Sequence, residues 1–332
     1  MNRRCVVLLS GGLDSMLAIR LMQQQGVEVE GLNFKTVFTC CQDTSAQSAR
    51  ELGVRLTVIG QQDDYLDLVR NPRFGYGRGA NPCVDCRIYM FEKAKHFMKE
   101  IGADFIVSGE VVGQRPMSQK RRDLLKIAYH SELEDLLLRP LSAKLLPPTR
   151  PEREGWIDRE KLYGFSGRGR KELIVLAKQL GIRSLPTPST GCALTEPGFS
   201  RKVFDLMEQP AATKRWDYEL LKVGRHFRLD ATTKVVLGRS EPENEQLEYL
   251  HSVSESASSA LMIPDDFAGP CALMIGSAGE NALRFAGGLI LRYAQNKPVG
   301  TRTARLDTKD ECRLVSIDSC TRANQAVTVG SP

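Results

Sequence analysis

The chain has 332 residues, of which 42% are hydrophobic and 26% are charged. This composition is typical of a globular protein with room for about two domains, and it excludes an intrinsically disordered chain, a collagen and a coiled coil. The net charge of +6, from 46 Lys and Arg against 40 Asp and Glu, permits an anionic partner without requiring one. The sequence has no run of about 18 apolar residues, so we expect a cytoplasmic protein without a membrane span.

The first half of the chain alternates short β-rich runs with helical patterns. Strands are predicted over residues 5–9, 27–34, 55–59 and 105–108. Helices are predicted over residues 15–25, 44–52 and 88–101. Strands and helices in strict alternation are typical of an α/β fold with a doubly wound parallel sheet. The ligands of such sheets bind at the carboxyl ends of the strands.

The second half begins with a looser pattern. The proline-rich residues 147–151 predict a rigid connection, and helices follow over 172–180 and 200–208. We place a boundary at 210–213, which gives a first domain over 1–209 and a smaller α+β domain over 216–320. The elements expected in the smaller domain are strands over 225–229, 234–237, 272–275 and 313–317 and helices over 243–250 and 280–293. The polar last dozen residues are expected to fray.

A glycine-rich turn, Ser10-Gly11-Gly12-Leu13-Asp14-Ser15, joins the first strand to the first helix. Two glycines let the backbone turn tightly and bring N–H groups close to an anion, and the helix N-terminus adds a favourable dipole. Ser10 and Ser15 can donate hydroxyl hydrogen bonds, and Asp14 can hold Mg²⁺ against phosphates. It is not a Walker A loop, because no Lys-Ser/Thr follows the glycines. These features alone leave open a plain strand-to-helix turn in which Asp14 caps the helix.

The complete string resembles the pyrophosphate loop of the PP-loop (N-type) ATP pyrophosphatases. The resemblance implies an ATP site, with Mg²⁺ as the metal of the nucleotide. The loop residues implied for this site are Ser10, Gly11, Gly12, Asp14 and Ser15. It also implies adenylation, in which an oxygen of the substrate attacks the α-phosphate of ATP and pyrophosphate leaves.

Nine cysteines are dispersed along the chain, and an odd, scattered set in a reducing compartment argues against disulfide staples. Cys83 and Cys86 form a Cys-x-x-Cys pair before a predicted helix, whose N-terminus is expected to lower the pKa of both thiols. Cys192 follows much later in a Gly/Thr loop. Three thiols leave open a zinc site completed by Cys40 or Cys41, an iron–sulfur cluster with one open iron, and a metal-free persulfide pair.

Several ordered segments then narrow the chemistry. Asn81-Pro82-Cys83-Val84-Asp85-Cys86-Arg87 resembles a segment of the tRNA 2-thiouridylases, and Ser189-Thr190-Gly191-Cys192 resembles their second cysteine loop. Residues 107–119 resemble a segment of the tRNA 4-thiouridine synthetases, with one extra residue near its end. Leu138-Arg139-Pro140-Leu141 and Lys171-Glu172 also look like that family. The likeness covers roughly the first 208 residues.

The resemblance implies that ATP activates a uridine carbonyl oxygen as an adenylate, which sulfur then displaces. The residues it implies for catalysis are Asp14, Cys86, Cys192 and Lys171, where Lys171 stabilises the activated intermediate. The second wall of the nucleotide site is implied at Ser108, Gly109 and Gln114. The three cysteines implied as ligands of a 4Fe-4S cluster, which we favour over a persulfide, are Cys83, Cys86 and Cys192. No rhodanese-like sulfur carrier is recognised, so we expect sulfide or a cysteine desulfurase as the sulfur donor.

Basic clusters and the C-terminal domain predict an RNA partner. The clusters lie at Arg115 and at residues 120–122, 168–171 and 214–216. Residues 224–245, together with 268–273 and 279–282, resemble the RNA-binding domain of NFACT proteins. We expect His226 to be a strand residue at the surface of that domain rather than a catalyst.

We therefore predict an ATP-dependent tRNA sulfurtransferase that makes a thiouridine. One alternative is a PP-loop amidotransferase or ligase that acts on a small molecule, which would need neither the cysteines nor a basic surface. The other is a non-catalytic RNA-binding protein with a vestigial phosphate loop. The sequence leaves open which uridine and which tRNA are modified, and also the oligomeric state, a homodimer included.

Overall fold

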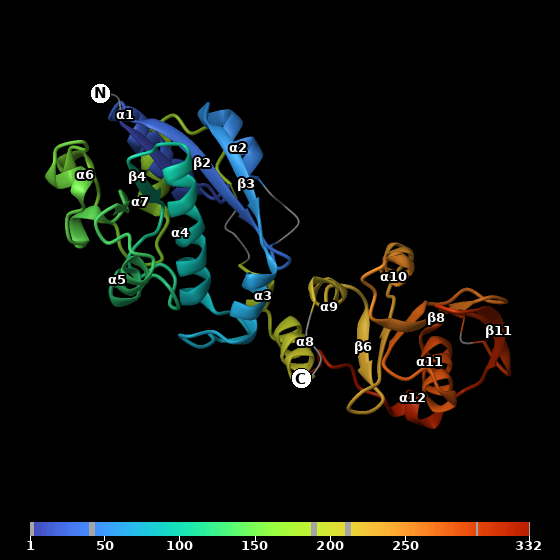
Figure 1. Ribbon diagram of the computed structural model, residues 1–332. Helices are drawn as coiled ribbons and strands as arrows, with labels where there is room; N and C mark the ends of the chain where they lie inside the picture. The colour runs from blue at the N-terminus through green and yellow to red at the C-terminus, as the bar shows by residue number, and fades with distance from the viewer. Residues whose placement is uncertain (1–2, 40–43, 187–190, 210–213, 297, 332) are drawn as a thin grey trace. The chain divides into compact units, whose positions relative to one another are not determined.

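The computed structural model describes residues 3–39, 44–186, 191–209, 214–296 and 298–331. By its internal contacts the chain divides into two compact units, Met1–Cys192 and Ala193–Pro332 (Figure 1). This division falls before helix α8 (Pro197–Met207), which the sequence assigned to the first domain. The predicted boundary at 210–213 lies outside the described residues. No helix in the described part of the chain is long and apolar enough to cross a membrane.

The first unit is built on a parallel sheet with the strand order β3-β2-β1-β4-β5. The strands are β1 (Arg4–Leu8), β2 (Glu28–Lys35), β3 (Arg55–Gly60), β4 (Phe105–Ser108) and β5 (Leu137–Leu138). Strand β1 lies in the middle, where Cys5 pairs with Val29 on one side and with Phe105 on the other. The predicted α/β class with a doubly wound parallel sheet is therefore confirmed.

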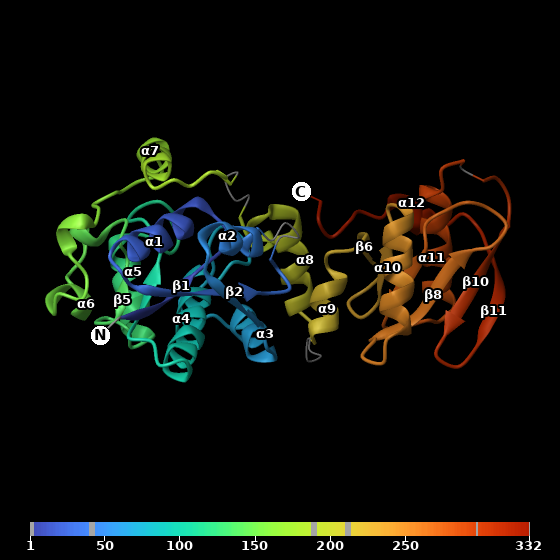
Figure 2. The ribbon, with the colours of Figure 1, turned by 90° about the horizontal axis from the view of Figure 1, so that it is seen from above.

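Helices cover both faces of this sheet. They are α1 (Leu13–Gln24), α2 (Ser45–Leu52), α3 (Asp63–Arg70), α4 (Cys83–Glu100), α5 (Arg121–His130), α6 (Arg150–Arg153) and α7 (Lys171–Gln179). Figure 2 shows α1 and α2 on one side of the sheet and α3 and α4 on the other. Side chains alternate along β1, so Cys5 and Val7 pack in the core under α1, whereas Val6 and Leu8 pack in the core under α4. Burial on both faces explains why the strand reads as an unbroken apolar run.

Helix α4 begins at Cys83, five residues before its predicted start at residue 88. Its first turn contains two cysteines and an aspartate, so the apolar periodicity used for the prediction begins only after that turn. Helix α5 was not predicted, because its first residues were interpreted as a basic run. Its buried residues Leu124, Ile127 and Ala128 have the spacing of one helical face. Helix α3 was also missed.

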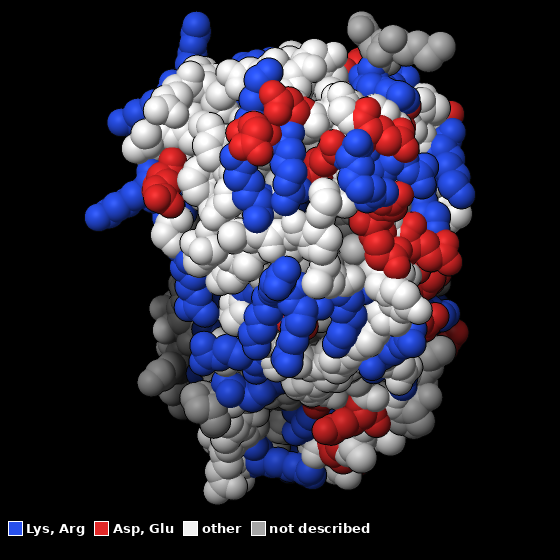
Figure 3. All heavy atoms as spheres, turned by 90° about the vertical axis from the view of Figure 1, so that its left-hand side faces the viewer, with Lys and Arg blue, Asp and Glu red and all other residues white. Residues whose placement is uncertain are grey.

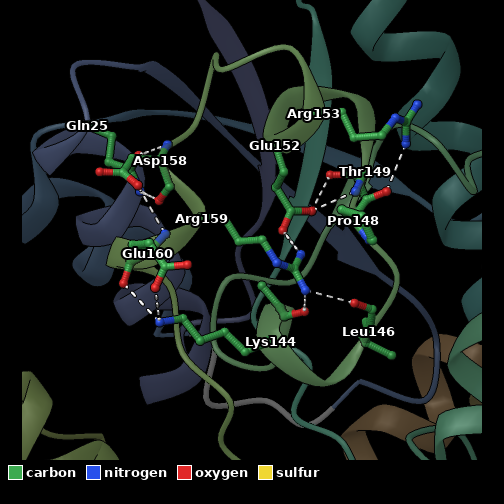
Figure 4. A network of polar contacts seen from close by, with 11 residues as sticks. Gln25, Lys144, Leu146, Pro148, Thr149, Glu152, Arg153, Asp158, Arg159 and Glu160 are labelled. Atoms are coloured by element: carbon green, nitrogen blue, oxygen red, sulfur yellow. Dashed lines mark hydrogen bonds and ion pairs between the residues drawn. The ribbon is translucent and has the colours of Figure 1, made fainter.

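The segment between β5 and α7 is locked by a polar network rather than only by its prolines (Figure 4). Glu152 accepts hydrogen bonds from the backbone nitrogen and hydroxyl of Thr149, both at 2.7 Å, and thereby caps α6. Arg159 forms an ion pair with Glu152 and donates to the carbonyl oxygen of Leu146 at 3.0 Å. Lys144 reaches the Glu160 carboxylate at 3.1 Å. These contacts hold the chain in place as it returns toward α7.

The second unit contains an antiparallel sheet with the strand order β11-β10-β8-β9-β7-β6. Its strands are β6 (Arg225–Arg228), β7 (Lys234–Leu237), β8 (Ser258–Pro264), β9 (Ala272–Ile275), β10 (Arg302–Thr308) and β11 (Cys312–Ile317). Its helices are α8, α9 (Arg215–Leu220), α10 (Glu241–Ser252), α11 (Glu280–Tyr293) and α12 (Thr321–Gln325). Separate apolar cores lie under α11 and under α10. The smaller α+β architecture is confirmed, although β8 and β10 were not predicted.

Two expectations about this unit were wrong. His226 is completely buried rather than at the surface, and its Nε2 lies 2.8 Å from the carbonyl oxygen of Val223. The last residues do not fray over their described part, because the backbone nitrogen of Val329 donates to the carbonyl oxygen of His226 at 2.9 Å. Arg201 of α8 also donates to the carbonyl oxygen of Gly330 at 2.8 Å. These hydrogen bonds hold the polar tail through its backbone atoms. Such bonds require no apolar side chains, so the sequence contains no pattern that predicts them.

Candidate functional site

The glycine-rich turn follows β1 and leads directly into α1. Gly11 has a φ of 77°, a left-handed conformation that glycine adopts without strain. An added Cβ at Gly11 would lie 2.4 Å from Oγ1 of Thr44 and 2.7 Å from the backbone nitrogen of Ser45, so the start of α2 packs against the turn. The hydroxyl of Ser15 donates to the carbonyl oxygen of Gly12 at 2.8 Å. The turn thus has the narrow, glycine-dependent shape that the sequence predicted.

Asp14 lies in the first turn of α1 and has one uncommitted oxygen. Its Oδ2 accepts a hydrogen bond from Nε2 of Gln114 at 3.0 Å, whereas its Oδ1 is buried and has no hydrogen-bond partner. Burial raises the pKa of Asp14 above its usual value, although Gln114, Arg170 and Arg115 oppose this shift. A buried carboxylate oxygen without a partner is costly unless a cation or a donor approaches it. Asp14 therefore fits the Mg²⁺ that accompanies a nucleotide.

The segment after β4 forms a wall against the start of α1. An added Cβ at Gly109 would lie 2.4 Å from the carbonyl oxygen of Asp14 and 2.7 Å from the backbone nitrogen of Ser15. Ser108 ends β4, and its hydroxyl accepts a hydrogen bond from the backbone nitrogen of Glu110 at 3.1 Å. The structure therefore brings Ser108, Gly109 and Gln114 to the glycine-rich turn, where the sequence had placed a second wall.

A buried ion pair fixes the base of this wall. The carboxylate of Glu110 lies 3.0 Å from Nε of Arg139, and both side chains are only 3% exposed. Nε of Arg87 approaches the other carboxylate oxygen of Glu110 at 3.4 Å. These two arginines keep the pKa of Glu110 below its usual value, although burial acts in the opposite direction. Because Arg87 directly follows Cys86, Glu110 links the segment after β4 to the cysteine segment.

The residues around Cys83 and Cys86 each have a structural task. Asn81 is buried; its Nδ2 donates to the Cys83 sulfur at 3.0 Å, and its Oδ1 accepts from the backbone nitrogen of Gly79 at 3.0 Å. Asp85 accepts from the backbone nitrogens of Arg73 at 2.9 Å and Phe74 at 3.1 Å. The Asn-Pro-Cys-x-Asp-Cys segment thus holds its own preceding loop in place and presents both cysteines in the first turn of α4.

Tyr65 of α3 lies among the predicted cysteines. Its hydroxyl is 3.3 Å from the Cys86 sulfur, and it interacts electrostatically with Cys83 and Cys192 as well. Burial raises the pKa of Cys86, although Tyr65 and Arg87 oppose this shift. The expectation that the helix N-terminus would lower the pKa of Cys86 was therefore wrong, because burial of the thiol outweighs it. Tyr65 belongs to no recognised motif, and its contact with Cys86 becomes visible only once α3 is placed in the fold.

Arg115 connects the cysteines to the phosphate turn. Its guanidinium interacts electrostatically with the Asp14 carboxylate and with the thiols of Cys83 and Cys192. Residues at the ends of β1 and β4, at the start of α4 and in the loop of Cys192 therefore converge on one region of the first unit. The sequence placed Arg115 only in a basic cluster, without assigning it to the site.

Lys171 begins α7, and its side chain is exposed. The residue before it, Arg170, acts electrostatically on Asp14. The backbone nitrogen of Gly167 donates to the carbonyl oxygen of Val112 at 2.7 Å, so the basic loop before α7 lies beside the segment after β4. Arg170 is therefore a further site residue, and the role of Lys171 stays a prediction.

The described geometry does not form a metal centre. Among residues 3–39, 44–186, 191–209, 214–296 and 298–331, no group of three or more His, Cys, Asp or Glu side chains is placed to hold a metal ion. Cys83, Cys86 and Cys192 gather around Tyr65 without becoming such a set, so the three thiols as placed do not fit a cluster. Cys40 and Cys41 lie outside the described residues. The 4Fe-4S cluster stays a prediction.

These features define a Rossmann-like α/β unit that is followed by a separate α+β unit. Residues 3–146 match the family described as the tRNA methyl transferase HUP domain. Residues 224–318 match the family described as the NFACT protein RNA binding domain. Both matches confirm the resemblances carried by the motifs, to PP-loop tRNA thiouridylases in the first unit and to NFACT proteins in the second.

Curated relatives agree with the first match. The chain is 31% identical over 121 residues to tRNA-specific 2-thiouridylase MnmA of Sulfurimonas denitrificans, covering 34% of this chain and 36% of the relative. It is 27% identical over 245 residues to MnmA of Pseudomonas fluorescens, covering 69% and 62% of the two chains. The aligned part is thus less than two thirds of the length of these relatives. A solved 4-thiouridine synthetase–RNA complex with bound ATP is 21% identical, with coverage of 54% and 52% and a TM-score of 0.34.

Proposed function

We propose that this protein is an ATP-dependent tRNA sulfurtransferase that converts a uridine carbonyl to a thiocarbonyl. The observation that carries the proposal is the convergence of Asp14, Gln114 and Arg115 with the cysteines in one region of the first unit. An anion-binding turn and a set of thiols are the two parts that activation and sulfur transfer require. The NFACT-type match of the second unit supports RNA as the substrate class.

In the first step, a carbonyl oxygen of uridine attacks the α-phosphorus of ATP, and pyrophosphate leaves. The backbone N–H groups at Gly11 and Gly12 and the N-terminus of α1 would bind the phosphates. Mg²⁺, when bound through Asp14, would neutralise charge on the departing pyrophosphate. Gln114 would orient the Asp14 carboxylate, and Arg115 would stabilise the negative charge that develops on the phosphate.

In the second step, a sulfur nucleophile attacks the activated carbon of the uridine. A carbon–sulfur bond forms, the bond between the carbon and the phosphate-bearing oxygen breaks, and AMP leaves. With hydrogen sulfide as the nucleophile, this step needs no oxidant. Free hydrogen sulfide would attack the uridine directly, with Cys83, Cys86 and Cys192 beside it. If a cysteine desulfurase is the donor, its persulfide would pass the outer sulfur to one of these cysteines, a second cysteine would release that sulfur to the uridine by forming a disulfide with the first, and a thiol reductant would then reduce the disulfide. Lys171 and Arg170 would stabilise the adenylate.

The test uses purified protein, total tRNA, ATP, Mg²⁺ and sulfide, with thionucleosides measured by mass spectrometry and ATP–pyrophosphate exchange measured in parallel. Asp14→Asn should lower exchange at least tenfold, and Cys86→Ser should abolish thiolation. Cys312→Ser, which removes an exposed cysteine of the second unit, is the matched control and should keep full activity. Full thiolation by Cys86→Ser would refute the assignment.

The same assay separates the alternatives. Exchange that requires RNA supports the proposal, whereas exchange with a small molecule alone indicates an amidotransferase or ligase. RNA binding without any exchange indicates a non-catalytic protein. An absorption spectrum with iron and sulfide counts on anaerobically purified protein tests the cluster: a brown, iron-containing protein supports it, and a colourless, active, iron-free protein excludes it.

A further inference from the structure

A strongly basic surface lies on the first unit beside the cysteine segment. It consists of residues 70–79, which run from the last residue of α3 toward α4, and residues 120–130, which include α5. We refer to it as the α5 surface. Its Lys and Arg residues are Arg70, Arg73, Arg78, Lys120, Arg121, Arg122 and Lys126. Its one acidic residue, Asp123, is buried. The net charge of these two segments is thus +6, the same as that of the whole chain, so the remaining charges of the protein cancel.

Aromatic contacts join the two segments into one surface. The Phe74 ring lies 5.0 Å from the His130 ring, and Nζ of Lys126 lies 4.9 Å from the centre of the Phe74 ring. The Arg73 guanidinium lies 5.2 Å from the same ring. Tyr129 packs edge-on against His130 at 5.1 Å and is 65% exposed. Cations that surround one aromatic ring, next to a second ring open to solvent, form a surface on which bases can stack and phosphates can bind.

The α5 surface is also tied to the cysteines. Asp85, which lies between Cys83 and Cys86 in the first turn of α4, accepts the backbone N–H groups of Arg73 and Phe74. The α5 surface therefore adjoins the cysteine segment. Figure 3 shows the side of the first unit on which α5 and α6 lie in Figure 1, and Lys and Arg side chains form a band across its middle with few acidic side chains among them.

We propose that the α5 surface binds the substrate RNA, with Arg73, Arg122 and Lys126 on its phosphates and Tyr129 stacked on one of its bases. This would be a second RNA contact of the chain, separate from the unit with the NFACT-type match. The proposal rests on the proposed function only in its choice of RNA as the partner. A polyanion with aromatic bases complements both the charge and the exposed ring, whereas an acidic protein would complement the charge alone.

The experiment measures binding of total tRNA to the full chain by fluorescence anisotropy between 50 and 300 mM salt, without ATP or sulfide. Arg73→Ala/Lys126→Ala should weaken binding at least tenfold and reduce the slope of log K against log salt by roughly 1.4 to 1.8, because each lost phosphate contact contributes about 0.7 to 0.9. Tyr129→Ala should weaken binding about fivefold or more with little change of slope, because base stacking is largely independent of salt.

The matched control is Lys99→Ala/Lys161→Ala, which also removes two exposed positive charges of the first unit. Lys99 lies in the last turn of α4, about 24 Å along the helix axis from Cys83 at 1.5 Å per residue. This variant should leave the affinity and the slope within twofold of the wild type. Ultraviolet cross-linking of the unmodified protein gives a readout that needs no variant, and the cross-linked peptides should contain residues 70–79 or 120–130.

Unchanged affinity and slope in Arg73→Ala/Lys126→Ala, with cross-links confined to the second unit, would overturn the proposal. If that result came with thiolation by the wild-type protein, the proposed function would stand and only the surface would be refuted. The reverse result is also informative: the variants could bind RNA more weakly while the wild-type protein does not thiolate tRNA. That result would support the α5 surface as an RNA contact and refute the proposed function. Thermal melts confirm that each variant folds.

Discussion

Replacing Gly109 by alanine perturbs the contact between the nucleotide wall and the start of α1. The added methyl group would lie 2.4 Å from the carbonyl oxygen and 2.5 Å from the carbonyl carbon of Asp14, and 2.7 Å from the backbone nitrogen of Ser15. All three are backbone atoms, so no side-chain rotation can relieve the overlap. Ordinary van der Waals contacts of a Cβ are 3.4–4 Å, so the wall and the helix must separate by about 1 Å.

The size of the effect follows from that displacement. Overpacking of this kind costs roughly 1–3 kcal/mol, and for a unit of this size each kcal/mol lowers the melting temperature by about 2–4 °C. A shift of 1 Å at the reacting groups lowers the rate by about 100-fold. We therefore expect Gly109→Ala to lower the melting temperature by roughly 2–12 °C, to weaken ATP binding at least tenfold and to reduce pyrophosphate exchange about 100-fold.

The assay combines calorimetric titration with ATP and Mg²⁺, a thermal melt and pyrophosphate exchange. Gly60→Ala is the control, because Gly60 ends β3 of the same sheet, has no positive φ, and an added Cβ there would meet nothing within 4 Å. It should behave like the wild type in all three measurements. Wild-type ATP affinity and stability in Gly109→Ala would refute the assigned contact between the wall and the phosphate turn.

Three further predictions concern buried polar groups. Because Tyr65 opposes the upward shift of the Cys86 pKa, Tyr65→Phe should move the pH profile of Cys86 alkylation, followed by mass spectrometry, further upward; an unmoved profile would contradict the contact. Glu110→Gln leaves Arg139 buried without its anion and should lower the free energy of unfolding, measured with urea at pH 7, by about 3–5 kcal/mol. This difference from the wild type should shrink as the pH falls through the depressed pKa of Glu110, because the wild type then loses the same charge. Burial holds the pKa of His226 well below its usual value near 6.5, so unfolding of the second unit should become easier as pH falls from 7 to 5, and a flat stability profile would argue against a neutral buried His226.

The fold was largely predictable because its central strands are buried on both faces. Burial of β1 and β4 under helices on two sides leaves unbroken apolar runs, which the sequence displays directly. Elements with a polar or cationic beginning were missed or shortened, as in α5 and the first turn of α4. Strands β8 and β10 were missed as well. The prediction missed β10 although its polar and apolar residues alternate in the pattern of a half-exposed strand.

The site was predictable where a residue lies at the end of a parallel strand or in a short motif. The turn after β1 and the segment after β4 meet because neighbouring parallel strands end at the same edge of the sheet. Tyr65 and the pairing of Glu110 with Arg139 were not predictable, since each depends on contacts between elements far apart in the chain. Spacing reveals which residues share an element, but not which side chain of another element lies opposite.

The environment of Cys86 bears on the proposed sulfur transfer. Cys86 is half-buried with its sulfur 3.3 Å from the Tyr65 hydroxyl, and burial of the thiol raises its pKa. A thiolate is the form that attacks sulfur donors and binds metals, and the Arg87 guanidinium beside Cys86 already favours that form. Arg115 already interacts with Asp14 and with the thiols of Cys83 and Cys192. Sulfur transfer as we propose it would use the positive charge of Arg87 and Arg115 to favour the thiolate form of these cysteines against the effect of burial.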